Sequence, residues 1–194
     1  MDKFKLSTPV VEVMADIVKA VEVAILPQLQ AYDANIQNIN YIHGHVLEVI
    51  ETLRQYDEDP ALRKSKYQLV ILIQDFTEQR DGDPSSPYAD LTMRVAICFH
   101  TSPEYKDFTR YEKVFKPVLY PIYQELIQQM YLSPAFFVDN PYNIVHTKKD
   151  RPYWGKEEVY GNSANKLDDF IDAIELNPLK IKQELFYCKN PINS

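Results

Sequence analysis

His43, Gly44 and His45 place two imidazoles two residues apart, and Cys98 and His100 repeat that spacing later in the chain. In an extended segment, residues two apart point to the same face, so each pair presents two ligands together. Imidazole nitrogen and thiolate are ligands that Zn²⁺ accepts in proteins. If the two segments were neighbouring strands, His43, His45, Cys98 and His100 would be candidate zinc ligands. The alternative is a histidine pair at a strand end beside a small buried thiol, because the spacing of structural zinc fingers is absent.

A metal-dependent nuclease-like site is the second chemical candidate. Asp75 stands at the end of an aliphatic run, and Glu104 and Lys106 follow the next apolar segment. Sites of this kind use carboxylates to hold Mg²⁺ and a lysine near the attacking water. Glu104 and Lys106 come after Pro103, outside the predicted strand, so a solvated loop is the competing interpretation.

Other kinds of catalytic site find little support in the residue pattern. The four glycines are scattered, which excludes phosphate loops and dinucleotide fingerprints. No serine lies in a G-x-S-x-G turn, and Cys98 is predicted to be buried in a strand. We therefore assign no catalytic residue and no cofactor. Four carboxylates near the C-terminus are predicted to form a solvated face: Asp168, Asp169, Asp172 and Glu175.

The composition of the 194-residue chain is that of a globular protein, with 45% hydrophobic and 25% charged residues. Its 28 acidic against 21 basic residues give a net charge of −7, which argues against nucleic-acid binding through a broad basic face. Two cysteines suggest a reducing compartment, and no apolar stretch has the ~20 residues of a membrane span. The first residues lack the apolar region of a signal peptide. We expect a protein that contacts no membrane.

The tyrosines, a basic cluster and a long polar segment favour contacts with other proteins. The chain has 14 tyrosines, several of them next to proline, and tyrosine is frequent at protein interfaces. Lys148, Lys149 and Arg151 belong to the only compact basic cluster, which suits a phosphate backbone or an acidic protein surface. The polar segment 77–88 has the length of a functional loop. The predicted interface residues are Glu78, Arg80, Asp81, Asp83, Tyr88, Lys148, Lys149, Arg151, Tyr153 and Trp154.

The spacing of apolar residues predicts the helices and strands of the N-terminal half of the chain. Apolar residues at steps of three and four predict a helix over 10–25, with Thr8 as its N-cap, that ends or kinks at Pro27. Weak alternation over 35–43 predicts a strand, and residues 46–53 return to helical spacing. Residues 67–76 and 91–99 predict two antiparallel strands joined by the long polar connector 77–88.

The C-terminal half is predicted to begin with a long helix over 111–130. Pro117 and Pro121 lie inside it, so we expect a kink or a helix that restarts with Pro121 in its first turn. Residues 132–165 predict an ordered excursion rich in proline and aromatics, and 179–187 predict a closing strand after a break at Asn177-Pro178. The sum is a single α+β domain over 1–194, with an antiparallel or mixed sheet of about four strands and helices packed on it.

Five segments that cover most of the chain from residue 40 onward share one resemblance: residues 41–45, 67–75 with Gln79 and Arg80, 115–123, 146–155 and 169–176. These segments resemble a protein family found in tailed bacteriophages that infect Bacteroidetes-type hosts. The order of predicted elements is also similar to that of tail-terminator and neck proteins. These proteins form rings, commonly hexameric, that cap the tail tube and join it to the head.

The resemblance implies a non-enzymatic virion component, assembled in the host cytoplasm and located in the tail or neck. Its partners would be other copies of the chain in a ring, with a hexamer favoured, and the tail-tube and connector proteins. DNA would be a partner only if it passed through the ring lumen. Two alternatives stay open: a metal-dependent nuclease-like enzyme, and a host intracellular interaction protein.

Overall fold

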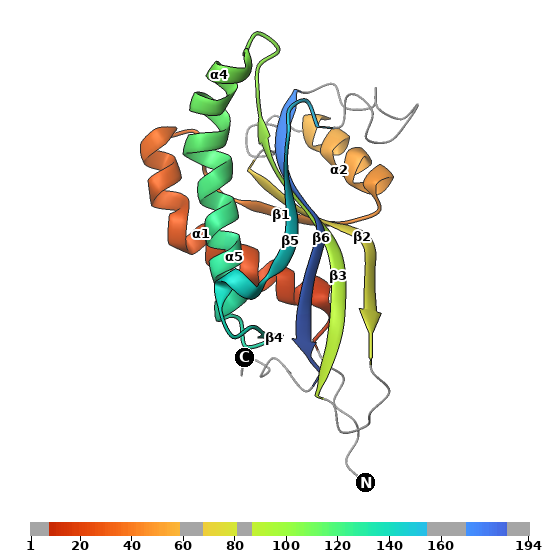
Figure 1. Cartoon of the computed structure of the whole chain (residues 1–194). Coiled ribbons are helices and arrows are strands. Elements are labelled where there is room, and N and C mark those ends of the chain that lie inside the picture. Colours follow the sequence, from red (N-terminus) through yellow and green to blue (C-terminus); the bar gives the residue numbers. More distant parts are fainter. Residues whose placement is uncertain (1–7, 59–67, 81–86, 155–169, 186–194) are drawn as a thin grey trace, which may run out of the picture.

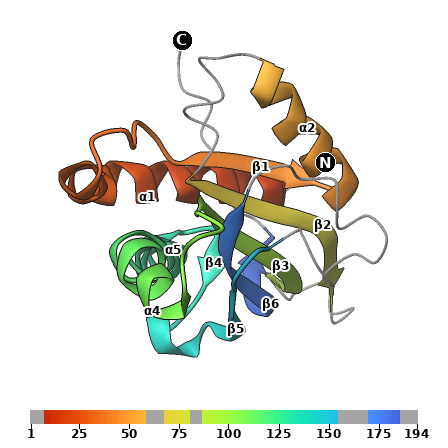
Figure 2. The ribbon, with the colours of Figure 1, turned by 90° about the horizontal axis from the view of Figure 1, so that it is seen from above.

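The computed structural model describes residues 8–58, 68–80, 87–154 and 170–185. Their fold is α+β, with a mixed sheet that curls around two long helical segments (Figures 1 and 2). The sheet has six strands in the order β1-β2-β3-β6-β4, with β5 also paired to β6. The prediction of an α+β domain with a mixed sheet is confirmed, whereas the expected number of about four strands is too low. No helix in these ranges is long and apolar enough to cross a membrane.

Helix α1, Val10–Tyr32, is the predicted N-terminal helix and is longer than expected. It begins at Val10, so the N-cap position is held by Pro9 and the predicted N-cap at Thr8 is wrong, and the helix continues through Pro27 for five more residues. Pro27 has no N–H, so one backbone hydrogen bond of the helix is absent. Because Pro27 is exposed, this gap lies on the solvent side of the helix. The apolar stripe is buried against the sheet as predicted.

A parallel crossover follows. Strand β1, Asn40–Gly44, pairs in parallel with β2, Leu69–Gln79, and helix α2, Val46–Glu58, lies between them in the chain. The Glu48 carboxylate accepts the His45 backbone N–H at 3.2 Å, which satisfies a free donor at the start of α2. β1 is therefore an edge strand whose only described neighbour is β2.

Strand β3, Tyr88–His100, is antiparallel to β2, as predicted. The ladder continues as far as the pair Gln79 and Asp90. Thr77, Glu78 and Gln79 thus belong to β2, and the connection is residues 80–87 instead of the expected 77–88. Of that connection, residues 81–86 lie outside the described ranges.

The long helix predicted over 111–130 consists of three consecutive parts: α4, Asp107–Arg110; the π-helix η1, Tyr111–Leu119; and α5, Tyr120–Leu132. Pro121 lies in the first turn of α5, so the predicted restart at this proline is confirmed. The Tyr120 N–H donates to the carbonyl of Phe115, five residues back. Pro117 and Pro121 have no N–H to donate, which favours a wider turn at this point.

The described part of the aromatic excursion returns to the sheet. Strand β4, Phe136–Phe137, the 3₁₀ turn η2, Pro141–Asn143, and strand β5, Val145–Arg151, follow one another along its edge. Strand β6, Ile171–Glu184, pairs with β3 on one side and with β4 and β5 on the other. The prediction that the closing strand begins after a break at Asn177-Pro178 is wrong. β6 begins at Ile171 and continues through these two residues with only an irregularity in its register with β3.

Two apolar clusters lie on opposite faces of the sheet. Helices α1, η1 and α5 cover the α1/α5 face, within the curve of the sheet, and α2 covers part of the other face, called here the α2 face (Figure 2). Under α2 lie apolar side chains from β2, β3 and β6, joined by Trp154. The half of the α2 face nearer to Gln79 and Glu184 is covered by no described helix.

Candidate interaction surface

The candidate zinc ligands do not converge. β2 separates β1, which carries His43, from β3, which carries Cys98 and His100, so the assumption that these strands adjoin is wrong. His43, His45 and His100 are exposed, whereas Cys98 is 1% exposed beneath α2. Within the described ranges, no group of three or more His, Cys, Asp or Glu residues is placed to hold a metal ion.

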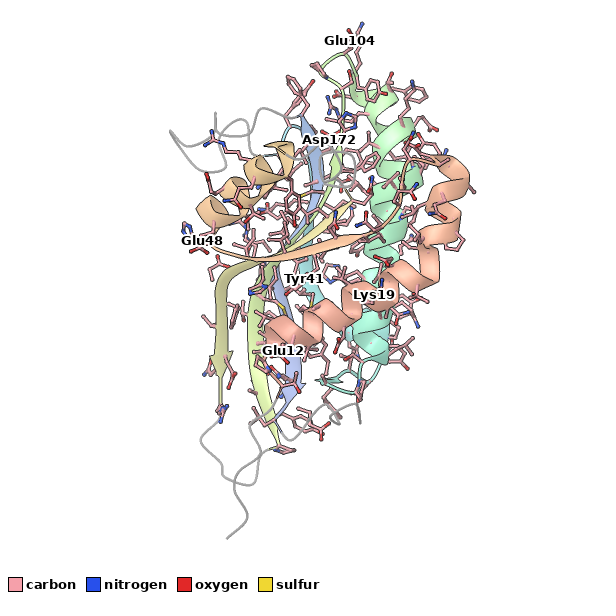
Figure 3. All side chains as sticks on the ribbon, turned by 180° about the vertical axis from the view of Figure 1, so that it is seen from behind. Glu12, Lys19, Tyr41, Glu48, Glu104 and Asp172 are labelled. Atoms are coloured by element: carbon pink, nitrogen blue, oxygen red, sulfur yellow. The ribbon has the colours of Figure 1, made fainter. Side chains whose placement is uncertain are left out.

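The candidate nuclease residues lie at different ends of the sheet. Asp75 lies six residues beyond Leu69 along β2, and Leu69 pairs with Cys98, near the end of β3 that leads to Glu104. Because the strands are antiparallel, this places Asp75 and Glu104 about 20 Å or more apart along the sheet. Glu104 and Lys106 are exposed in the segment that precedes α4, and Figure 3 labels Glu104 at that end of the molecule. The expected carboxylate pair is therefore not brought together.

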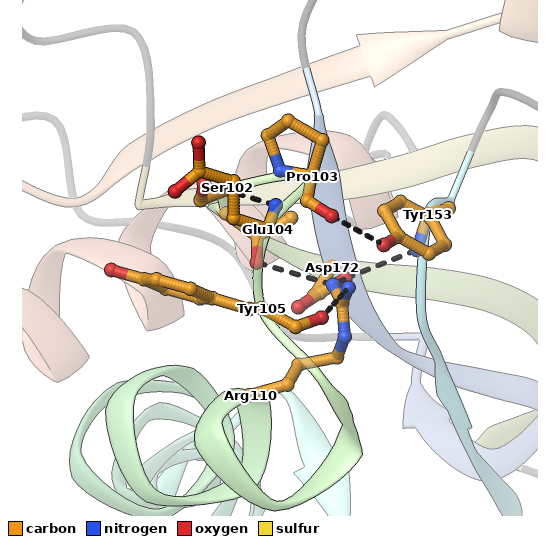
Figure 4. Close-up of polar contacts among 8 residues, drawn as sticks. Ser102, Pro103, Glu104, Tyr105, Arg110, Tyr153 and Asp172 are labelled. Atoms are coloured by element: carbon orange, nitrogen blue, oxygen red, sulfur yellow. Dashed lines mark hydrogen bonds and ion pairs between the residues drawn. The ribbon is translucent and has the colours of Figure 1, made fainter.

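A buried ion pair connects the start of β6 to the helices (Figure 4). Arg110 donates from Nη1 to Asp172 Oδ1 at 2.5 Å and to Thr101 Oγ1 at 3.1 Å, and from Nη2 to the Tyr105 carbonyl at 2.9 Å. Burial opposes the charge on Arg110, but its hydrogen bond and charge interaction with Asp172 outweigh this effect and raise its pKa. The arrangement satisfies a charge that would otherwise be costly to bury.

Tyr153 completes this cluster. Its ring lies 4.1 Å from the Arg110 guanidinium carbon, and its backbone N–H donates to Asp172 Oδ1 at 3.0 Å. The Tyr153 hydroxyl donates to the Pro103 carbonyl at 3.3 Å, and its φ of 54° is a left-handed conformation. These contacts hold the end of β5, the loop after β3 and the start of β6 together.

A second buried carboxylate lies on the α2 face. Glu175 is 1% exposed and accepts from Arg94 Nε at 2.6 Å and from Arg151 Nε at 3.2 Å. Burial raises the pKa of the neighbouring Cys98 thiol, and the Glu175 charge adds to the rise. The predicted solvated face is therefore wrong for Asp172 and Glu175, which are buried and ion-paired. Asp168 and Asp169 lie outside the described residues.

The predicted interface residues differ widely in their surroundings. Trp154 is 2% exposed within the cluster under α2, so its assignment to an interface is corrected: the side chain is part of the core. Tyr153 is half-buried in the Arg110 cluster, and Arg151 is paired with Glu175. Lys149 is exposed on the α2 face.

Lys148 lies on the opposite face, in an aromatic cluster. Its Nζ donates to Asp150 at 2.5 Å and lies 4.6 Å from the Tyr120 ring centroid. The Tyr120 hydroxyl donates to Asp150 at 2.7 Å. Burial, followed by this hydrogen bond, raises the pKa of Tyr120 to about 12. Lys148 therefore secures β5 against α5.

The predicted loop residues surround the end of β2. Glu78 and Arg80 are both exposed and form an ion pair of 2.7 Å. The Tyr88 ring packs on Phe137 with 4.7 Å between ring centroids. Asp81 and Asp83 lie outside the described residues.

Sequence reasoning missed a row of cations on the α2 face, which runs from the border of the cluster under α2 onto the uncovered half. Cross-strand pairing places Lys180 beside Val145, and Lys182 beside Phe137 and Asp90. Alternation of Lys180 and Lys182 with buried Leu179 and Ile181 was the available signal. We call this area the cationic sheet surface, formed by Arg94, Lys149, Arg151, Lys180 and Lys182.

Exposed apolar side chains border the cationic sheet surface. Phe137 is 46% and Val145 62% exposed, and both line a hollow of about 260 Å³ with Lys180 and Lys182. Tyr142, 93% exposed, lines a second hollow of about 440 Å³ between α5 and β5. We call Phe137, Tyr142 and Val145 the apolar edge. The neighbouring charged and apolar areas are suited to contact with a macromolecule.

Comparison with known proteins gives no family for this chain. A scan against protein-family models finds no match, and a search of curated proteins finds no match.

Proposed function

We propose that the chain is a non-enzymatic structural subunit of a phage virion, a tail-terminator or neck ring protein that joins the tail tube to the head-proximal connector. Part of the described order of elements supports this: an N-terminal helix, two strands joined by a hairpin connection, a packed helix and a closing strand, to which this chain adds β1, α2, β4 and β5. This order is the one that the sequence resemblance implies. A shared order of elements is an analogy, so the proposal depends on the surfaces.

The observation that carries the proposal is the apolar edge. Its three side chains are 46%, 93% and 62% exposed, and they come from one segment that leads from β4 into β5. Burying large apolar side chains against a partner stabilises a complex by about 25 cal/mol per Å² removed from water. A subunit that works by assembly requires such an area on its free surface.

The topology suits head-to-tail assembly. β1 lies at one end of the sheet, and β4 and β5 lie at the other. Contact between unlike surfaces on neighbouring copies closes into a ring when the rotation between them permits it. The proposed ring has six copies by the family resemblance, stacks on tail-tube and connector proteins, and contacts DNA only if DNA passes through its lumen.

Sedimentation velocity over rising protein concentration tests the proposal. The wild-type chain should form oligomers, and Phe137→Ser with Val145→Thr should shift the association to higher concentration. The matched control is Phe108→Ser with Val23→Thr, because these side chains are 76% and 73% exposed on other elements. Equal association of both double variants and the wild type would contradict a role for the apolar edge. A wild-type chain that stays monomeric throughout would contradict assembly.

A further inference from the structure

The larger of the two hollows beside the apolar edge has the volume of a small-molecule site. It measures about 440 Å³, and such sites range over roughly 300–1,000 Å³. One wall is α5, and the other is the segment that leads from η2 into β5 (Figure 1). Its polar lining comes from Tyr123, Gln124 and Gln128 on α5 and from Tyr142 and His146 on the opposite wall. We call it the Tyr142 hollow.

The Tyr142 ring is held in place although it packs on little else. It is 93% exposed, yet its backbone N–H donates to Asn140 Oδ1 at 2.8 Å. The Asn143 N–H donates to the Asn140 carbonyl, also at 2.8 Å, and Pro141 fixes the backbone between them. A ring positioned in advance by its turn costs little further ordering when a ligand stacks on it.

The hydroxyl of Tyr123 has a defined role in its hydrogen bond to His146. His146 Nδ1 lies 2.7 Å from the Ile144 carbonyl, which can only accept, so Nδ1 carries a hydrogen. Nε2 of the neutral ring is then an acceptor, and it takes the hydrogen of the Tyr123 hydroxyl at 2.8 Å. Burial raises the pKa of Tyr123, so the hydroxyl keeps this hydrogen. The Tyr123 oxygen therefore has only lone pairs to offer a ligand.

The charges around the Tyr142 hollow favour a neutral ligand. Its described lining consists of tyrosine, glutamine, isoleucine, proline and histidine side chains. Lys148 Nζ lies 5.7 Å from the Tyr123 ring, but it is already paired with Asp150 and lies over the Tyr120 ring. A cationic ligand would be repelled by Lys148, and an anionic ligand would meet no unpaired cation among the described lining residues.

The hydrogen-bonding groups of the hollow narrow the class of neutral ligand. Gln124 and Gln128 are exposed on one face of α5, and each amide both donates and accepts. The Tyr123 oxygen needs a donor, which the prolines of a proline-rich segment lack. Sugar hydroxyl groups both donate and accept, and the weakly positive C–H face of a sugar ring suits the negative face of the Tyr142 ring.

We propose that the Tyr142 hollow binds a neutral hexopyranose ring. Tyr142 stacks on the C–H face of the sugar, while Gln124, Gln128 and the Tyr123 oxygen bind its hydroxyl groups. This inference goes beyond the proposed ring assembly and does not depend on it. Phe137 and Val145, the apolar-edge residues changed in the assembly test, line the other hollow.

Ligand-observed NMR by saturation transfer on the full chain tests the site. The probes are the methyl glycosides of glucose, galactose, mannose and N-acetylglucosamine. At least one should bind, with a dissociation constant of about 1 mM for an ordinary binding efficiency per atom. Tyr142→Ala should weaken this binding about tenfold, because it removes the stacking surface. Gln124→Ala with Gln128→Ala should weaken it by a similar factor.

Matched controls change the same kinds of side chain elsewhere. Phe108→Ala removes an aromatic ring that is 76% exposed on α4, and Gln28→Ala with Gln30→Ala removes two exposed amides from α1. Both controls should bind the sugar as the wild type does. Melting temperatures of all variants should match the wild type, so that a loss of binding reports the site and not the fold.

The outcomes separate this inference from its alternatives. Absence of binding by all four glycosides, or equal binding by the wild type, Tyr142→Ala and the glutamine variant, would overturn it. Tighter binding of glucose 6-phosphate than of methyl glucoside would assign the hollow to an anion and overturn it as well. Displacement of the sugar by an uncharged proline-rich peptide that binds more tightly would assign the hollow to a peptide instead.

The sugar site and the proposed function fail independently. Phe137→Ser with Val145→Thr should leave sugar binding unchanged, and loss of binding in this variant would contradict the placement of the site. A wild type that binds sugar and stays monomeric overturns ring assembly and leaves the sugar site standing. A wild type that assembles and binds none of the four glycosides does the reverse.

Discussion

Arg110 and Asp172 form an ion pair of 2.5 Å between side chains that are 3% and 0% exposed. They are 62 residues apart in the sequence and connect the helical segment to β6, an inner strand of the sheet. Arg110 also donates to the Thr101 hydroxyl oxygen, and the Tyr153 backbone N–H donates to Asp172, which fixes the geometry of the pair. The ion pair and its hydrogen bond from Tyr153 hold the start of β6 beside the end of β5. The last residue of β5 is Arg151, which belongs to the cationic sheet surface.

Removing one partner of this pair should be strongly destabilising. Asp172→Ala leaves the Arg110 charge buried without its carboxylate, and we expect a loss of about 3–5 kcal/mol in the free energy of unfolding. Urea denaturation measures the change. Asp139→Ala, which removes an exposed carboxylate, should change stability by about 0.5 kcal/mol or less. Similar small effects for both variants would show that the pair is not buried as described.

Trp154 is the only tryptophan and belongs to the core under α2. Trp154→Ala should cost about 3–5 kcal/mol in unfolding free energy, because it leaves a large cavity. Native fluorescence emission should be shifted to shorter wavelength and move to longer wavelength on unfolding. Tyr142→Ala, at a 93% exposed position, is the matched control and should leave stability nearly unchanged. Solvent-like native emission would place Trp154 on the surface, as the sequence had suggested.

Cys98 should be unreactive in the folded protein. Burial raises the pKa of its thiol, so the reactive thiolate is scarce at mildly alkaline pH. Peptide mapping after alkylation should find Cys98 modified only when denaturant is present. Rapid modification under native conditions would contradict its place beneath α2.

The raised pKa of the Cys98 thiol also predicts that the free energy of unfolding depends on pH. An unfolded cysteine titrates near pH 8.5, and the folded pKa lies higher. The stabilising contribution is therefore complete below about pH 8.5 and is lost as the pH rises, by up to about 1.4 kcal/mol per pH unit. Cys98→Ala should lack this slope between about pH 8.5 and 10. An identical slope in both proteins would assign it to other groups.

Metal removal should have no effect on the purified chain. The histidines at 43, 45 and 100 are exposed, and β2 lies between β1, which carries His43, and β3, which carries Cys98 and His100. Elemental analysis should find no stoichiometric metal, and a chelator should leave the melting temperature unchanged. One equivalent of zinc, lost together with stability, would restore the metal hypothesis.

Local patterns predicted the elements that bury an apolar stripe. The helix from Val10, the strands around 67–76 and 91–99 and the restart at Pro121 all follow from spacing that a single helix or strand imposes on its own residues. Strand β5, VHTKKDR, was not predicted because an edge strand with exposed cations lacks apolar alternation. Its pairing depends on β6, which lies beyond it in the chain.

The prediction of a solvated face at Asp172 and Glu175 was wrong for a different reason. Asp172 and Glu175 have the helical spacing of a solvated face, and nothing nearby in the sequence neutralises them. Their partners Arg110 and Arg94 are 62 and 81 residues away, so only the folded sheet brings them together. Likewise, Lys180 and Lys182 become one surface with Lys149 and Arg151 only when β5 pairs with β6.

Negative-stain electron microscopy of chemically cross-linked oligomers tests ring assembly most directly. The proposed head-to-tail contact predicts closed rings with a single rotation axis, with six-fold averages favoured, and a lower yield of rings from the Phe137→Ser/Val145→Thr variant. Particles limited to monomers at every concentration, or to dimers with two-fold symmetry that use one surface against itself, would contradict the account.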